Sequence, residues 1–121
     1  MSRLVITEEF SQSPFGRYKS TVLPKEQDSS GETFRTNLLA PKLREAIENN
    51  DVLTVVLTGY NRYGRSFLDE AFGGLIRECG FTYDEIKQHL RYEHATVKQI
   101  PEVIRERIDR AAVFTGQKNE D

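Results

Sequence analysis

Residues 53–79 constrain the fold of this chain more than any other stretch, because they join an apolar strand to an amphipathic helix through a polar turn. Residues 52–57 form a short apolar run rich in β-branched side chains, and Asp51 and Gly59 bound it. Such a run is typical of a central strand that is covered on both faces. Residues 59–65 then carry two glycines and an asparagine without any apolar period, so the chain is expected to turn there.

The helix predicted after this turn begins at Ser66, whose hydroxyl suits an N-cap position. Asp69 follows three residues later and completes a weaker form of the capping box, and both Asp69 and Glu70 suit the positive end of the helix dipole. Apolar residues then recur at helical spacing and predict one buried stripe. This stripe consists of Phe67, Leu68, Ala71, Phe72, Leu75, Ile76 and Cys79.

The opposite face of this helix is polar but contains a glycine. A glycine inside a helix costs about 1 kcal/mol relative to alanine, and packing on the predicted buried side does not explain Gly73. Two interpretations remain open, because the face either docks a protein partner or is a solvated surface with a tolerated glycine. In the docking interpretation the contact residues are Tyr63, Arg65, Asp69, Glu70, Gly73 and Arg77.

The remaining strands are predicted near the two ends of the chain. Residues 3–10 and 18–23 have the composition of strands, and residues 11–16 form a turn between them with two serines, a proline and a glycine. Residues 90–94 are predicted as the last strand. Strands interleaved with helices favour the α/β class, here with a small mixed β-sheet and helices packed on it.

The first helical region is predicted from a capping box formed by Ser29 and Glu32, which starts a helix that runs to Leu39. Pro41 is expected to interrupt this helix. Residues 41–49 are therefore a second helix or a kinked continuation of the first.

Two helices are predicted after the central one. Thr82 and Glu85 form a capping box at the start of a short helix. Residues 98–114 combine an apolar stripe with charged pairs at helical spacing, and Pro101 lies near the start, where proline is tolerated. These features predict a long helix over residues 98–114.

Length and charge limit the classes of function. A chain of 121 residues is long enough for one domain, predicted over residues 1–115 with a polar tail at 116–121. The net charge of −2 argues against a general nucleic-acid or anionic-membrane binder. The single Cys79 cannot form an internal disulfide, and no apolar run is long enough to span a bilayer. We expect a cytoplasmic protein without a cofactor.

Three motifs stand apart from the periodic patterns. They are Gly16-Arg17-Tyr18, then Ser30-Gly31-Glu32-x-Phe34-Arg35-x-x-Leu38-Leu39-x-Pro41-x-Leu43, and then Ser66-Phe67-Leu68-Asp69-Glu70-Ala71-Phe72-Gly73-Gly74-Leu75. Together they resemble the STAS-like domain family of unknown function, over roughly residues 15–108. That family is similar to the STAS domains of anti-sigma factor antagonists, so the resemblance implies a small α/β domain that acts by protein contact.

The resemblance also implies a phosphorylation switch. In the antagonists, a histidine-kinase-like ATPase phosphorylates a serine at the start of the helix after a central strand, and this breaks their complex. The corresponding position here is Ser66, in the sequence Gly64-Arg65-Ser66-Phe67 where the antagonists carry Asp-Ser-Ser-Gly. The alternative role for Ser66 is a plain N-cap.

The histidines, the candidate nucleophiles and the arginines bear on other kinds of chemistry. Two histidines, His89 and His94, lack a metal-like spacing and are expected to be solvated, so no metal site is predicted. No nucleophile lies next to a base in any motif for catalysis, so no catalytic residue and no enzyme activity are predicted. The alternative function is a small nucleotide- or phosphate-binding sensor or enzyme with an arginine-lined pocket. Its residues would be Arg17, Arg35, Arg62 and Arg65. In a purely structural role, Arg35 would instead form a surface ion pair with Asp69 or Glu70.

The sequence thus predicts a STAS-like regulatory module that contacts a protein partner through the loop at residues 59–66 and the helix that follows. A histidine-kinase-like ATPase is the expected partner, while nucleic acid and membranes are not expected. The oligomeric state stays open.

Overall fold

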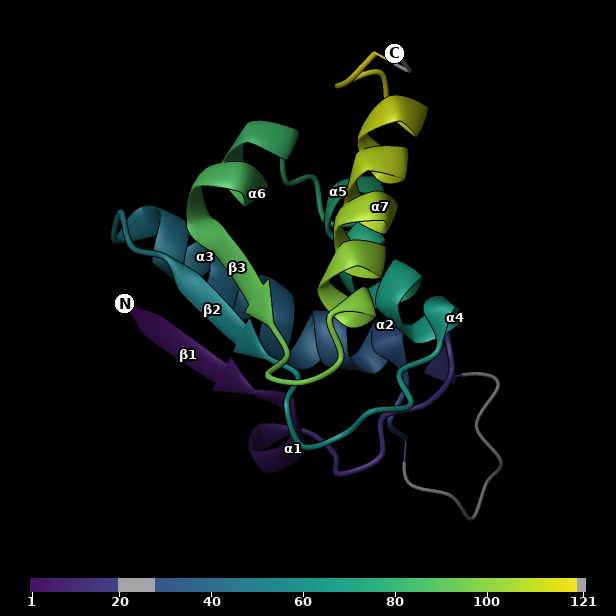
Figure 1. Cartoon of the computed structure of the whole chain (residues 1–121). Helices are drawn as coiled ribbons and strands as arrows, with labels where there is room; N and C mark the ends of the chain where they lie inside the picture. The colour runs from purple at the N-terminus through teal and green to yellow at the C-terminus, as the bar shows by residue number, and fades with distance from the viewer. Residues whose placement is uncertain (20–27, 120–121) are drawn as a thin grey trace.

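The computed structural model describes residues 1–19 and 28–119, and it places a parallel three-stranded sheet beside a layer of helices (Figure 1). The strands are β1 (Ser2–Val5), β2 (Leu53–Val56) and β3 (Leu90–Glu93), in the order β1-β2-β3. Both pairs are parallel. The predictions of an α/β fold and of a central strand at β2 are therefore confirmed, but the described sheet is wholly parallel and not mixed.

Strand β2 is buried on both faces, as its apolar sequence predicts. On the core face, Val55 lies between Leu4 of β1 and Tyr92 of β3. On the other face, an ion pair between Arg3 Nη1 and Glu93 Oε1 at 3.9 Å links the two outer strands. Long charged side chains can cover apolar surface in this way.

The start of the chain differs from its prediction. The strand expected over residues 3–10 ends at Val5, and α1 (Ile6–Glu9) follows. The change is stabilised locally, because Val5 N–H donates to Glu9 Oε2 at 2.7 Å. Of the strand expected at residues 18–23, positions 18 and 19 are not in a strand, and the rest lies outside the described residues.

One continuous helical run contains α2 (Gly31–Phe34), a π-helical turn η2 (Arg35–Leu39) and α3 (Ala40–Glu48). Its N-cap is Ser30, whose side chain accepts from Thr33 N–H, so the prediction of Ser29 as the cap was wrong by one residue. The run does not break at Pro41, so residues 41–49 continue the first helix and do not form a separate second one. The π turn widens the helix just before the proline, where its ring would otherwise crowd a carbonyl of the preceding turn.

A second continuous run contains α4 (Arg65–Leu68), a π-helical turn η3 (Asp69–Gly73) and α5 (Gly74–Arg77). The N-cap is Gly64, with extended φ −76° and ψ 153°, and no side chain caps the first turn. Ser66 lies at the second helical position, so the prediction that it caps the helix was wrong. Arg65 is already helical, which leaves the Ser66 hydroxyl beyond the capping position.

The last two helices follow their predictions closely. Helix α6 (Tyr83–His89) begins with the Thr82 and Glu85 capping box, and α7 (Gln99–Phe114) is the long C-terminal helix. The residues after α7 fold back, since Lys118 Nζ lies 3.2 Å from Asp109 Oδ2 and Gln117 Oε1 accepts from Tyr83 N–H. No helix in the described ranges combines the length and apolar character needed to cross a membrane.

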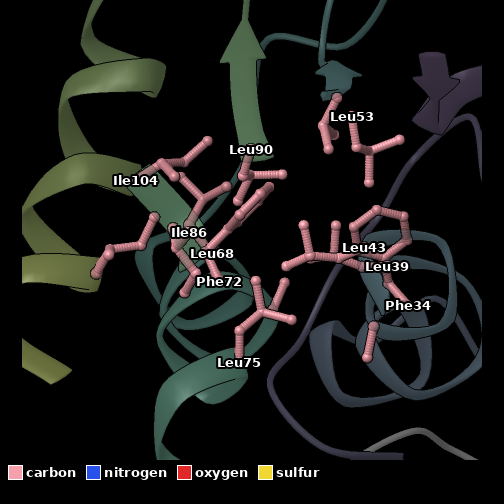
Figure 2. Packing of buried hydrophobic residues seen from close by; sticks show 14 of the residues in the cluster. Phe34, Leu39, Leu43, Leu53, Leu68, Phe72, Leu75, Ile86, Leu90 and Ile104 are labelled. Atoms are coloured by element: carbon pink, nitrogen blue, oxygen red, sulfur yellow. The ribbon is translucent and has the colours of Figure 1, made fainter. Parts of the chain in front are cut away.

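The core lies where the sheet and the helices meet (Figure 2). Leu53 and Leu90 enter it from the strands, while Phe34 and Leu43 enter from the α2 to α3 run. Phe72 and Leu75 project from the second run, and Ile104 from α7. Cys79 is partly buried against this cluster, as its position on the apolar stripe predicts.

Candidate functional site

Three arginines from separate parts of the chain converge on two adjacent carboxylates, Asp69 and Glu70, in η3. Arg17 Nη1 lies 2.6 Å from Asp69 Oδ2 and 3.4 Å from Glu70 Oε1. Arg35 Nη1 lies 2.6 Å from Glu70 Oε2, and Arg77 Nη2 lies 3.1 Å from Asp69 Oδ2. We call these five residues the charge cluster. The cluster joins the loop before α2, the turn η2 and both ends of the η3 to α5 segment.

The Arg35–Glu70 pair is the buried centre of the charge cluster, since each side chain is only 5% exposed. Arg35 Nη1 also donates to the backbone carbonyl of Glu70 at 2.5 Å. Ionised groups in the interior are costly unless opposite charges and hydrogen bonds compensate them. This double contact therefore fixes how the two π-helical turns lie against each other.

Glycines permit the close approach that the charge cluster needs. A Cβ on Gly31 would lie 2.6 Å from the backbone carbonyl oxygen of Phe67, and a Cβ on Gly74 would overlap the Arg35 guanidinium. A Cβ on Gly73 would lie 2.7 Å from Arg77 Nη1 and 3.3 Å from the carbonyl oxygen of Arg107 in α7. Gly73 thus serves internal packing against α7.

The charge cluster keeps Asp69 ionised. Burial opposes ionisation, but the hydrogen bond from Arg17 and the charge of Arg77 outweigh it, so the pKa of Asp69 lies below its ordinary value. The residue is therefore an acceptor of hydrogen bonds at neutral pH and has no proton to donate. It has the properties of a structural anion.

The first and second motifs of the sequence thus meet the third in space, because Arg17 contacts Asp69 and Arg35 contacts Glu70. The sequence matches the family described as a STAS-like domain of unknown function over residues 30–99, more than half of the chain. The chain belongs to this family. No curated protein and no solved structure shows a significant match to this chain.

Within this STAS-like domain, the predicted docking face of the central helix is not a free surface. Glu70 and Gly73 are buried, and Asp69 and Arg77 are partly buried in the charge cluster. The face is covered because both α7 and α2 pack against η3. The prediction that Glu70 and Gly73 contact a partner is therefore wrong, as is the solvated-face alternative.

Tyr63 is a further correction to the predicted contact residues. Its ring is 9% exposed and packs against Tyr60 and Phe67, with ring centroids 5.0 and 5.7 Å away. Its hydroxyl is buried without a hydrogen-bond partner in the described part of the chain, and burial raises its pKa. Tyr63 anchors the loop before α4 to the core.

The four arginines of the predicted phosphate pocket do not form one site. Arg17 and Arg35 are held by the carboxylates of the charge cluster, and the Arg35 side chain is only 5% exposed. Arg62 and Arg65 are exposed. Arg65 lies beside α7, where it lines an open groove with Glu102 and Glu106. The buried Arg35 is therefore not available to a nucleotide in the way that the predicted pocket requires.

Ser66 and Arg65 remain exposed at the start of the second helical run. The first turn contains no acidic side chain and has no side-chain cap. Helix N-termini leave N–H groups without intrahelical partners, and these groups favour an anion. Ser66 is the only residue of the helical run 65–77 that has a hydroxyl group, and its side chain is open to solvent.

His94 is a buried residue that the sequence interpretation missed, because it was expected to be solvated. Its Nδ1 accepts from Thr96 N–H at 3.1 Å and Val97 N–H at 3.0 Å, and its Nε2 donates to the Tyr60 carbonyl at 2.9 Å. It therefore joins the loop after β2 to the loop before α7. No group of three metal-ligating side chains occurs within residues 1–19 and 28–119.

Proposed function

We propose that this STAS-like domain is a non-enzymatic regulatory module that acts by contact with another protein, and that phosphorylation of Ser66 controls the contact. A histidine-kinase-like ATPase is the proposed partner. This class is chosen because such ATPases phosphorylate the corresponding serine in the anti-sigma factor antagonists that the family resembles.

The exposure of Ser66 is the observation that carries the proposal. The residue lies in an uncapped first helical turn, after the central strand β2 and the loop that follows it. The acidic residues of the same motif are tied to arginines in the charge cluster. Ser66 and Arg65, with Arg62 in the loop, are exposed and can meet another protein.

The proposed modification takes place on the partner's nucleotide. Ser66 Oγ attacks the γ-phosphorus of ATP held by the ATPase, the bond to the β-phosphate oxygen breaks, and ADP leaves. The hydroxyl proton passes to a base of the ATPase. The STAS-like domain supplies only the acceptor hydroxyl, so it needs no catalytic residue of its own.

The phosphate would change the contact surface without disturbing the fold. It adds about −1.5 to −2 charge at neutral pH, next to Arg65 and the free N–H groups of the first turn. Asp69 and Glu70 lie one turn further on, but they are already paired with arginines. The added charge therefore affects the partner more than the domain itself.

The test is an affinity purification from the cells that make this protein, with tagged wild type, Ser66→Asp, Ser66→Ala and the control Ser13→Asp. Ser13 is an exposed serine far from the helix in sequence. We expect wild type, Ser66→Ala and the control to retain an ATPase, and Ser66→Asp to lose roughly tenfold or more of it. Equal recovery with Ser66→Asp, or turnover of a small molecule by the purified chain, would contradict the proposal.

A further inference from the structure

Strand β3 lies at an edge of the sheet, and a groove of about 450 Å³ runs beside it. The groove is bounded by β3, α6 and α7, and we call it the β3 groove. It touches three consecutive strand residues, Leu90, Arg91 and Tyr92. Successive strand residues point to opposite faces of a sheet, so a groove that meets all three must follow the free edge.

A free strand edge presents backbone N–H and C=O groups that can pair with another strand. In this structure the Arg91 guanidinium lies along the edge, since its Nη1 donates to the carbonyls of Lys87 and Leu90 at 2.9 and 2.8 Å. Charged side chains at such positions are a common protection against unwanted pairing. The Arg91 side chain therefore lies over this edge of β3 and would have to move aside for another strand to pair with it.

The walls of the β3 groove are apolar, while its rim is positively charged. Ile108, Leu90 and the ring of Tyr83 form apolar surface. Lys87, Arg91 and Arg105 are exposed at the rim and form no ion pair within the described ranges, although Lys87 Nζ lies 5.3 Å from the centroid of the Tyr83 ring. This local excess of positive charge occurs in a chain of net charge −2.

The one acidic residue of the β3 groove is already neutralised. Asp109 Oδ2 lies 3.2 Å from Lys118 Nζ, and its Oδ1 accepts from the Tyr83 hydroxyl at 2.9 Å. The rim cations are consequently left to attract external carboxylates. Positive surface of this kind selects and orients acidic partners.

We propose that the β3 groove binds an extended, acidic segment of a partner protein, which adds to β3 as a fourth strand. Backbone hydrogen bonds to the strand edge hold the segment, an apolar side chain packs against the floor of the groove, and carboxylates meet Lys87, Arg91 and Arg105. Ser66 and the loop before α4 line no part of the groove. Binding here is therefore independent of the proposed Ser66 switch.

The experiment is selection of a random-peptide phage library on the full chain, followed by fluorescence anisotropy of the enriched peptides. We expect acidic, proline-free sequences whose affinity falls roughly tenfold or more for Arg91→Glu and for Arg105→Glu. Lys98→Glu, an exposed lysine outside the groove, is the charge-matched control and should retain the affinity. Amide hydrogens of residues 90–93 should exchange more slowly in the complex.

Several results would overturn the proposal. One is a selection that enriches no peptide. Another is a peptide affinity that Arg91→Glu and Arg105→Glu leave unchanged, and a third is binding that does not slow amide hydrogen exchange in residues 90–93. Sedimentation that shows a dimer broken by Arg91→Glu would make a second copy of the chain the occupant. Binding of decanoate without any peptide would make the groove a site for small amphipathic anions.

Discussion

Arg35 and Glu70, thirty-five positions apart in sequence, form a nearly fully buried ion pair in which Nη1 and Oε2 are 2.6 Å apart. The pair links one π-helical turn to another and lies at the centre of the charge cluster. The pair also explains two glycines of the motifs. Gly31 and Gly74 leave the space in which α2 and the Arg35 side chain come close to the second helical run.

Removal of one partner should be costly. We expect Glu70→Gln to lower the free energy of unfolding by about 3–5 kcal/mol, because it leaves the buried Arg35 charge without its carboxylate. Urea denaturation followed by circular dichroism measures the change. Glu106→Gln is the control, since Glu106 pairs with Arg110 on the surface of α7 and should cost under about 1 kcal/mol. Similar losses in both variants would show that the buried pair has no special role.

Gly31 should not tolerate even a methyl group. Alanine at this position would meet the Phe67 carbonyl oxygen, a backbone atom that cannot rotate away. We expect Gly31→Ala to destabilise the domain by about 1–3 kcal/mol, as measured by the midpoint of urea unfolding. Gly64→Ala is the matched control, since a Cβ there meets nothing within 4 Å, and its effect should stay within about 1 kcal/mol. A neutral Gly31→Ala would refute the close contact of α2 with the second helical run.

Acid should weaken the domain partly through Asp69. Its folded-state pKa lies below the unfolded value of about 3.9, so its stabilising effect is complete above that pH and is lost as pH falls through the folded pKa. Asp69→Asn should therefore be less stable than wild type at neutral pH, and its free energy of unfolding should fall less steeply below about pH 4. Denaturation series at several pH values compare the two slopes. Parallel curves for both proteins would contradict an ionised Asp69 in the charge cluster.

Elements with local patterns were predictable from sequence. Strand β2 and helix α7 follow from an apolar run and a helical stripe, and the Thr82 and Glu85 capping box appears as expected. Each of these signals lies within one segment and needs no knowledge of distant contacts. Ser30 was missed as a cap only because two adjacent serines both suit the position.

The charge cluster could be derived only in part, because the Arg35–Glu70 ion pair was expected as a surface contact, whereas its burial and the approach of Arg17 and Arg77 were not expected. Arg17 and Asp69 are 52 positions apart, and a polar pattern on one helix does not show which distant cation will reach it. The turn η3 also has π-helical hydrogen bonding, so the faces of this helix do not follow a regular 3.6-residue period. Glu70 and Gly73 therefore appeared solvent-facing in the sequence although α2 and α7 cover them.

The measurement that tests the regulatory interpretation most directly is the intact mass of the chain purified from the cells that make it, with and without ATP and the ATPase that copurifies. We expect the mass of one phosphate, assigned to Ser66 by fragmentation and absent from Ser66→Ala, while Ser13→Ala keeps it. A chain that carries no phosphate under any of these conditions, or a phosphate that persists in Ser66→Ala, would contradict the switch.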